Sequence, residues 1–565
     1  MHPQKGVIHF GLDSEGTGRE QTNLLSSPLR IAWPNAGNSA ISWQGTKDGA
    51  WTCSLGVGGR SGTVRWTIRR EGQDLVWQLA YEGTGEASGI SLTLPLNPLM
   101  TPTVALPAGF DAQGRSVGPW LVVAPNFGHL RVEAEPADGW TVVQSGTRGG
   151  GGPMGPFEGV DPRLRGQAWK DAVKDPGYSP GRLNLQFLPT KPLRAGSPLV
   201  LRFRPQELST PEGVDRAAWK RIRRAYLNNW QPCGTWMGPQ ASWVLANNSL
   251  SDPASCSLYF YAEPMLFWHQ PVPGVDIQVL LRRSLDYWLQ NHVSAQGHVN
   301  AFGRMYDLYP STGASLIISA WDYWKISGNT AWVDQQIDVL HRMADYLQRR
   351  DVDKDGLIES YGSGNAGTLR DPDRADIWFE MIHFGHKNAW ANALEYRAFL
   401  CTAEMLDATG HPKGGTYYRG IAAKLREAYV RQFLSPQTGW FVSWVSQDGQ
   451  VHDYCHTFVN GIAVAYGMVP PDEGKKILSR VVAKSKSIGF TAWHLGVPAN
   501  LIVLRNNSIH VFGTCGAARY SLRTTILEVN RLGQPLSGSL LSGMMVDGDR
   551  QLVIDETVGG DAQAA

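Results

Sequence analysis

Two carboxyl side chains lie close together in the stretch of this sequence that best suits chemistry. Asp376 and Glu380 flank Trp378 between a Gly-rich loop and a predicted helix. Glycoside hydrolysis uses two carboxyl groups, a protonated acid for the leaving oxygen and a base or nucleophile on the other side of the sugar ring. The pair therefore offers a general acid. The alternative is that one of them caps the helix or pairs with Arg374.

Aromatic and polar side chains on the predicted loops suit a sugar-binding cleft. The chain has 22 Trp, more than its 18 Tyr or 17 Phe. Aromatic faces provide stacking platforms, and sugar hydroxyls need paired donors and acceptors. Core packing is the alternative for each residue, and His456 has helix capping as another. The predicted substrate-binding residues are Tyr361, Trp378, His383, Lys387, Trp440, His456, Trp493 and His494.

An acidic turn resembles the beginning of a calcium loop. Asp351, Asp353 and Asp355 occupy loop positions 1, 3 and 5, and Gly356 occupies position 6. Position 12 is a glycine instead of the bidentate glutamate of an EF-hand, so Glu359 is the substitute ligand. The turn predicts a structural calcium ion, although no cofactor is required for the chemistry. A plain acidic turn after a helix is the alternative.

A helical period begins near residue 208. Apolar residues such as Val333, Ile337, Leu340 and Ala344 recur at spacings of three and four, which predicts amphipathic helices. The longer connections alternate with short ones, so function is expected on the long loops. The predicted helices span residues 214–230, 253–269, 275–293, 311–327, 330–350, 383–409, 415–434, 454–468, 471–487 and 511–532.

Residues 1–207 show a period of two instead. Val64, Trp66 and Ile68 alternate with polar residues, and the same alternation resumes at Leu75 after a turn. Many short strands with Gly and Pro between them predict an all-β sandwich. Further strands are predicted at residues 91–96, 120–124, 183–188 and 199–203. We therefore predict two domains, a β-sandwich over 1–207 and a helical domain over 208–565.

Composition excludes several classes of protein. Fifty-two Lys and Arg against fifty Asp and Glu give a net charge of +2, which leaves no basic excess for nucleic acid. The sequence contains no run of about 18 apolar residues, so no membrane span is predicted. The first 30 residues lack a signal peptide, so we expect a soluble protein, cytoplasmic or exported after removal of a signal. Six scattered cysteines indicate neither a zinc cluster nor a disulfide scaffold. The sequence leaves the oligomeric state open.

The stretch from Arg349 to Leu406 carries a family resemblance. A turn containing Asp355-Gly356-Leu357 follows one helix, then come Asp376, Trp378 and Glu380, and then a helix begins with an Asn-Ala-Leu-like sequence. This layout resembles the six-hairpin, (α/α)6-barrel glycoside hydrolases, among them the processing α-glucosidase I, glucoamylase and amylo-1,6-glucosidase families. The resemblance covers about residues 212–535 and implies an (α/α)6 toroid after the β-sandwich.

The resemblance also implies roles for particular carboxylates. α-Glucosidase I and amylo-1,6-glucosidase patterns place the acid at Asp376, whereas the glucoamylase pattern has a Glu directly after Trp, where this chain has Phe379. Asp376 is thus favoured as the acid, with Glu380 in support or in its place. The family supplies the second carboxylate late, and Glu556 is our choice. The alternatives are Asp547, Asp549, Asp555, Asp453 and Glu263.

We therefore expect a glycoside hydrolase that cleaves a glucosidic bond in an oligosaccharide or small glycoside by an inverting two-carboxylate mechanism. A polysaccharide lyase on the same toroid is one alternative, and it needs a Tyr/His pair such as Tyr454 and His456. The substrate of such a lyase would be an acidic polysaccharide, and the absence of an excess of basic residues argues against binding of that polymer. A non-catalytic carbohydrate-binding protein is the other alternative. A carbohydrate is the expected partner in each case.

Overall fold

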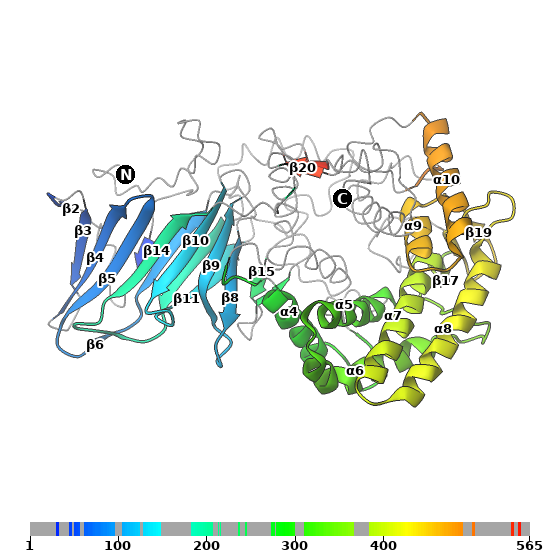
Figure 1. Cartoon of the computed structure of the whole chain (residues 1–565), viewed down its shortest axis with the longest axis horizontal. Helices are drawn as coiled ribbons and strands as arrows, with labels where there is room; N and C mark the ends of the chain where they lie inside the picture. The colour runs from blue at the N-terminus through cyan, green and yellow to red at the C-terminus, as the bar shows by residue number, and fades with distance from the viewer. Residues whose placement is uncertain are drawn as a thin grey trace. The chain divides into compact units, whose positions relative to one another are not determined.

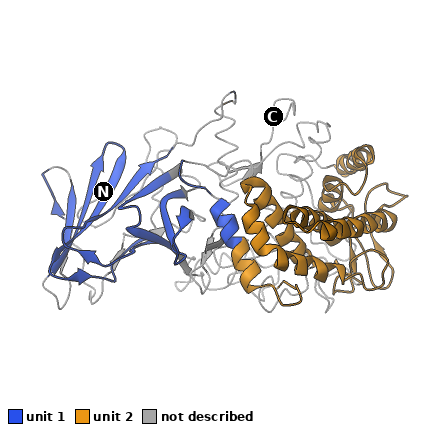
Figure 2. Cartoon of the chain, turned by 60° about the horizontal axis from the view of Figure 1, so that its bottom comes forward, with its two compact units in different colours: residues 1–213, 226–253, 268–284 blue, residues 214–225, 254–267, 285–565 orange. Residues whose placement is uncertain are grey.

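The structure describes the chain as a series of segments separated by gaps. The computed structural model describes residues 30–32, 44–47, 50–56, 62–96, 104–124, 128–147, 182–206, 213, 215, 235–237, 243–245, 273–276, 278–299, 310–365, 384–489, 500–502, 544–546 and 552–554. Contacts divide the chain into a first compact unit of residues 1–213, 226–253 and 268–284 and a second of residues 214–225, 254–267 and 285–565 (Figure 2). The predicted boundary at 207/208 stays a prediction, since residues 207–212 lie outside the described part.

Antiparallel sheets form most of the described part of the first unit. A four-stranded sheet has the order β1 (Arg30–Ala32), β7 (Ser91–Leu96), β12 (Arg182–Pro189), β11 (Trp140–Thr147). An eight-stranded sheet has the order β2 (Gln44–Gly45), β3 (Trp51–Gly56), β4 (Gly62–Glu71), β5 (Asp74–Gly83), β14 (Leu199–Pro205), β10 (Gly128–Glu135), β9 (Ser116–Ala124), β8 (Val104–Phe110). Two short pairs of this unit are β6 (Glu86–Ala87) with β13 (Leu193–Arg194) and β15 (Thr235–Met237) with β16 (Trp243–Leu245). A third pair, β20 (Met544–Val546) with β21 (Leu552–Ile554), belongs to the second unit.

Large aromatic side chains join the two main sheets. The ring centroids of Trp66 on β4 and Trp140 on β11 are 6.4 Å apart. Phe187 on β12 lies 6.1 Å from Trp120 on β9 and 5.8 Å from Phe203 on β14. All five side chains are buried. The two sheets therefore pack face to face through aromatic rings, which gives the N-terminal region its own core.

The β4–β5 hairpin confirms the prediction made from alternation. Val64, Trp66 and Ile68 are buried while their neighbours are not. Glu71 pairs with Asp74, so the connection is a two-residue turn. The other strands predicted from the sequence fall within β7, β9, β12 and β14.

Seven α-helices are described in the C-terminal region (Figure 1). Two of them match the predicted ranges residue for residue, and four more lie within two or three residues at each end. They are α4 (Gln278–Asn291), α5 (Ser311–Ser327), α6 (Thr330–Gln348), α7 (Ala389–Ala408), α8 (Pro412–Phe433), α9 (Thr457–Ala465) and α10 (Pro471–Ser487). The helices predicted over 214–230, 253–269 and 511–532 lie outside the described residues, apart from residue 215.

The helices differ in how they are buried. α5, α7 and α9 are buried along most of their length, whereas α6, α8 and α10 bury one stripe. α7 contacts α5, α6, α8 and α9, and Figure 1 shows α5 and α7 on the inner side of an arc with α6 and α8 outside. This is an arrangement of helical hairpins in two layers. A closed toroid stays a prediction.

One helix begins later than predicted. The range 383–409 was expected to be helical, but Lys387 and Asn388 form strand β17, and α7 begins at Ala389. Asn388 has an extended backbone, and its Oδ1 accepts a hydrogen bond from the Ala391 N–H. The strand and the cap together fix the start of α7.

Among the described residues, no helix is both long and apolar enough to cross a membrane.

Candidate active site

A small sheet connects the beginnings of two inner helices. It contains β17 (Lys387–Asn388), β18 (Trp444–Val445) and β19 (Val451–His452), and we call it the rim sheet. The Ser443 carbonyl accepts from the Ala389 N–H at the start of α7 (3.1 Å), and its Oγ lies 2.5 Å from His456 Nδ1 at the start of α9. Both helices therefore begin at the same end of the helical unit. The described parts of two long loops predicted to carry function, 351–382 and 435–453, meet there.

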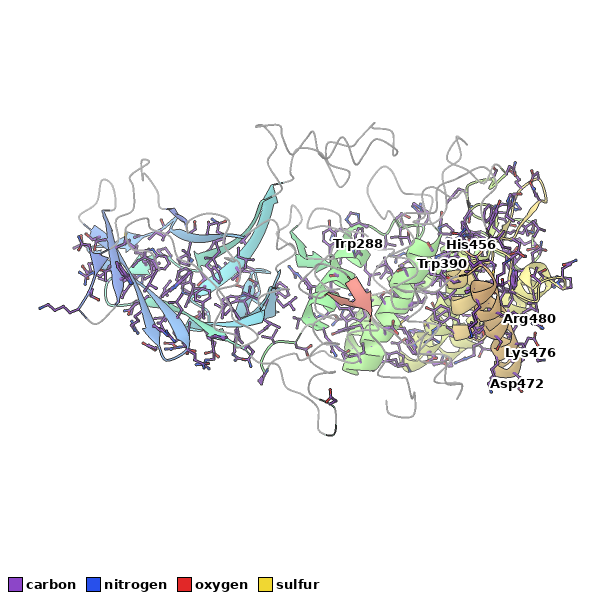
Figure 3. The ribbon with its side chains drawn as sticks, turned by 90° about the horizontal axis from the view of Figure 1, so that it is seen from above. Trp288, Trp390, His456, Asp472, Lys476 and Arg480 are labelled. Carbon is purple, nitrogen blue, oxygen red and sulfur yellow. The ribbon has the colours of Figure 1, made fainter. Side chains whose placement is uncertain are left out.

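An aromatic cluster packs behind the rim sheet. Trp444 stacks on His452 with ring centroids 4.3 Å apart and planes 7° apart. Phe384 lies 4.6 Å from Trp444 and 4.9 Å from His456. Figure 3 labels His456 and Trp390, whose rings both contact Phe458 at 5.0 and 5.2 Å. These rings give the rim a rigid base.

His456 lies fully inside this cluster. Its Nδ1 meets Ser443 Oγ, while its Nε2 has no hydrogen-bond partner among the residues that the structure describes. Burial lowers the pKa of His456 to about 3, so the imidazole is neutral at neutral pH. Tyr454 lies edge-on with ring centroids 6.0 Å apart. The predicted sugar contact of His456 stays a prediction, as does the Tyr454/His456 pair of the lyase alternative.

Two other predicted binding residues have polar partners in the structure. Trp440 Nε1 donates to the Asp453 carboxylate at 2.9 Å, and its ring packs against a small core that contains Cys455. The Tyr361 ring is 47% exposed and lies 3.7 Å from the Arg350 guanidinium carbon. The described faces of these two rings therefore already have neighbours, and their contact with a sugar remains a prediction.

The acidic turn and Lys387 form an ion-pair cluster beside the rim sheet. Carboxylate oxygens of Asp351, Asp353, Asp355 and Glu359 lie within 4.8 Å of one another. Lys387 Nζ donates to Asp353 Oδ2 at 2.6 Å and also to Asp355 Oδ2. Although burial lowers the pKa of Lys387, these two hydrogen bonds raise it above the usual value overall. Lys387 is thus a charged partner of this turn.

Glu359 is the most strongly perturbed carboxyl of this cluster. It is 6% exposed, and its Oε2 accepts from the Val352 N–H at 2.7 Å. Burial raises the pKa of Glu359 to about 7; the Val352 N–H and Lys387 act in the opposite direction, and Asp353 raises the pKa further. Glu359 is therefore half protonated near neutral pH.

We expect the substitution Glu359→Gln to flatten the pH dependence of stability. The unfolded carboxyl titrates near about 4.3, whereas the folded pKa is about 7. Between these values the folded state holds a proton that the unfolded chain has lost, so stability falls as pH rises. Thermal unfolding from about pH 4.5 to 8 should show the wild-type Tm falling more steeply than that of Glu359→Gln. Parallel curves contradict this prediction.

The predicted catalytic carboxylates lie outside the described residues. The same is true of four predicted binding residues, and the full set is Asp376, Trp378, Glu380, His383, Trp493, His494 and Glu556. The residues that flank segment 366–383 are described. The Ser360 N–H donates to the His386 carbonyl at 2.8 Å, and the His386 N–H donates to the Gly362 carbonyl at 2.6 Å. The segment that contains Asp376 therefore leaves and returns at one place, beside the rim sheet.

Trp444 fastens one flank of that segment. Its Nε1 donates to the Gly364 carbonyl at 3.0 Å. Gly364 has φ +70°, and a Cβ there would lie 2.9 Å from Trp444 Nε1, so this position needs glycine. Neither Trp444 nor Ser443 was predicted from the sequence. One signal was present, because His452, Tyr454, His456 and Phe458 alternate as side chains on one face of an extended segment do.

Comparison with known proteins defines the class of the helical region. Residues 282–510 match the model of a six-hairpin glycosidase domain, which confirms the resemblance to six-hairpin glycoside hydrolases for this segment. The family model is that of the bacterial α-L-rhamnosidase six-hairpin glycosidase domain. The segment includes α5 to α10, the acidic turn and the rim sheet. No curated protein sequence matches the chain.

Solved structures of glycoside hydrolases are similar at low identity. The GH78 rhamnosidase of Bacillus sp. GL1 is 11% identical with a TM-score of 0.37, over 75% of this chain and 41% of that one. A rhamnose-bound rhamnosidase from Klebsiella oxytoca is 12% identical with a TM-score of 0.41, over 77% and 85%. A bacterial glucoamylase complexed with acarbose is 12% identical with a TM-score of 0.31, over 79% and 70%. The chain thus covers less than half of the Bacillus enzyme.

Proposed function

We propose that the protein hydrolyses glycosidic bonds, with α-L-rhamnosides as the first substrate class. The match of residues 282–510 to the rhamnosidase six-hairpin domain carries this proposal. The glucosidic bond expected from the sequence is the second substrate class, since the resemblance to glucosidase families rests on residues 349–406. A carbohydrate is then the physiological partner.

The proposed mechanism uses two carboxylates and inverts the anomeric centre. Asp376 donates a proton to the glycosidic oxygen, with Glu380 in support of it or in its place. Glu556 activates a water on the opposite face of the ring, which in inverting enzymes requires a carboxyl separation of about 6.5–9.5 Å. The expected base, Glu556, lies far from Asp376 in the sequence, and a two-carboxylate site can be built from residues that are distant in sequence.

The described contacts hold the two flanks of the segment that contains Asp376. Hydrogen bonds join residues 359–362 to 386–387, and Trp444 holds Gly364. The described residues on the two sides of this segment are therefore held together. The buried Trp444, His452 and Phe384 rings pack against one another beside them.

Activity on a panel of aryl glycosides is the direct test. We expect the protein to release the aryl group from an α-L-rhamnoside or an α-D-glucoside, with the product anomer, followed by NMR, inverted relative to the substrate. A product that retains its configuration contradicts the inverting mechanism. Absorbance near 235 nm with an acidic polysaccharide supports the lyase, and glycan binding without turnover supports the non-catalytic alternative.

A further inference from the structure

The acidic turn contains more negative charge than its own segment neutralises. Asp351, Asp353, Asp355 and Glu359 lie within nine residues of sequence, and their oxygens gather within 4.8 Å. Like charges at this separation repel, so such a cluster needs a cation or protons. A divalent metal is one solution, and a protein ammonium is another.

The cations around the turn make different contacts. Lys354 Nζ donates to the Asp351 carbonyl, Arg350 to the Glu359 carbonyl, and Arg431 to the Asp355 carbonyl. Lys387 instead donates to the carboxylates of Asp353 and Asp355. Its side chain is only 10% exposed, so its charge depends on these two partners.

The donor set does not fit a calcium loop while Lys387 is in place. The twelfth loop position is Gly362, which lacks a carboxylate. Glu359, the substitute ligand, uses one oxygen for the Val352 N–H. A divalent ion would have to displace the Lys387 ammonium from Asp353 and Asp355.

We propose that the Lys387 ammonium is the built-in counter-cation of the acidic turn and takes the place of a divalent metal ion. Lys387 directly precedes Asn388, which caps α7, and its backbone bridges to Glu359. The ammonium therefore ties the turn after α6 to the beginning of α7 without a metal. Removal of the ammonium should convert the turn into a site that binds Ca²⁺. This inference goes beyond the proposed hydrolase activity and is independent of it.

Thermal unfolding in EDTA and in CaCl₂ tests this proposal. Wild type and Lys354→Met, the matched control from the same turn, should each have the same Tm in both buffers. Lys387→Met should lose several degrees in EDTA and regain them in CaCl₂. The proposal is overturned if Lys387→Met behaves like Lys354→Met, or if Ca²⁺ raises the wild-type Tm and the rise disappears in Asp353→Asn/Asp355→Asn.

A second set of variants tests the pairing if Lys387→Met does not fold. Asp353→Asn/Asp355→Asn leaves a nearly buried ammonium without its partners and should lower Tm. The additional substitution Lys387→Met removes that charge and should restore part of the loss. A triple variant no more stable than the double variant overturns the pairing, whatever the response to Ca²⁺.

Discussion

Replacing Asp376 by asparagine is expected to lower turnover by about 10²–10⁴-fold, because a positioned general acid contributes that much. This loss corresponds to about 2.7–5.4 kcal/mol of transition-state stabilisation. Asparagine has the same shape as aspartate but cannot donate the proton, so folding and sugar binding should be kept. Steady-state kinetics on an aryl glycoside measure the change. Asp472→Asn, on the exposed face of α10, is the matched control and should leave the rate unchanged.

The leaving group separates a lost acid from a disturbed site. A glycosyl fluoride needs little proton assistance, so Asp376→Asn should lose much less activity on the fluoride than on a poor leaving group. An equal loss on both substrates indicates that the substitution damaged binding or folding instead. If Glu380→Gln abolishes turnover while Asp376→Asn keeps it, Glu380 is the acid and the glucoamylase-like alignment is the better one.

The sequence predicted correctly those helices and strands whose ends are set by neighbouring residues in the chain. The helices over 311–327 and 471–487 were predicted residue for residue because each has a clear stop signal. Gly328 ends α5 in a left-handed conformation, and Asn329 Oδ1 accepts from the Trp332 N–H to begin α6. The β4–β5 hairpin was predicted from its alternation and its two-residue turn for the same reason.

Elements fixed by distant partners could not be predicted in this way. Strand β17 exists because Lys387 and Asn388 pair with Val445 and Trp444, far along the chain. The buried surface of α7 extends around most of the helix, so no polar face marked its true beginning. The predicted sugar contact of Lys387 stays a prediction, whereas its ion pairs with Asp353 and Asp355 were not predicted. Nothing in the local sequence announces those ion pairs.

Two buried asparagines show a regularity that sequence reasoning missed. Asn392 and Asn460 each lie four residues after the N-cap of an inner helix, α7 or α9. Asn392 exchanges hydrogen bonds with the Ile358 N–H and carbonyl at 2.8 and 2.9 Å. Asn460 does the same with Phe441 at 2.8 and 3.2 Å. Each asparagine thus holds by hydrogen bonds the loop that follows the preceding outer helix, α6 for Asn392 and α8 for Asn460. The α6–α7 and α8–α9 hairpins are therefore built alike.

Replacing Asn392 by alanine should destabilise the protein by about 2–6 kcal/mol, because it leaves two buried backbone groups of Ile358 without partners and each such group costs about 1–3 kcal/mol. Asn392 is 0% exposed and Ile358 3% exposed, so water does not replace the lost hydrogen bonds freely. Denaturant unfolding measures the change in the free energy of unfolding. Asn460→Ala should cause a loss of similar size, since its contacts with Phe441 have the same pattern.

An exposed asparagine supplies the control for this prediction. Asn291, at the end of α4, makes one hydrogen bond to the Tyr287 carbonyl. Asn291→Ala should change the free energy of unfolding by no more than about 0.5 kcal/mol. A loss for Asn392→Ala as small as that of the control would contradict the pinning role. A large loss in Asn392→Ala and Asn460→Ala alike would mean that the turn after each outer helix depends on an amide from the next inner helix, and that the rim sheet rests on both.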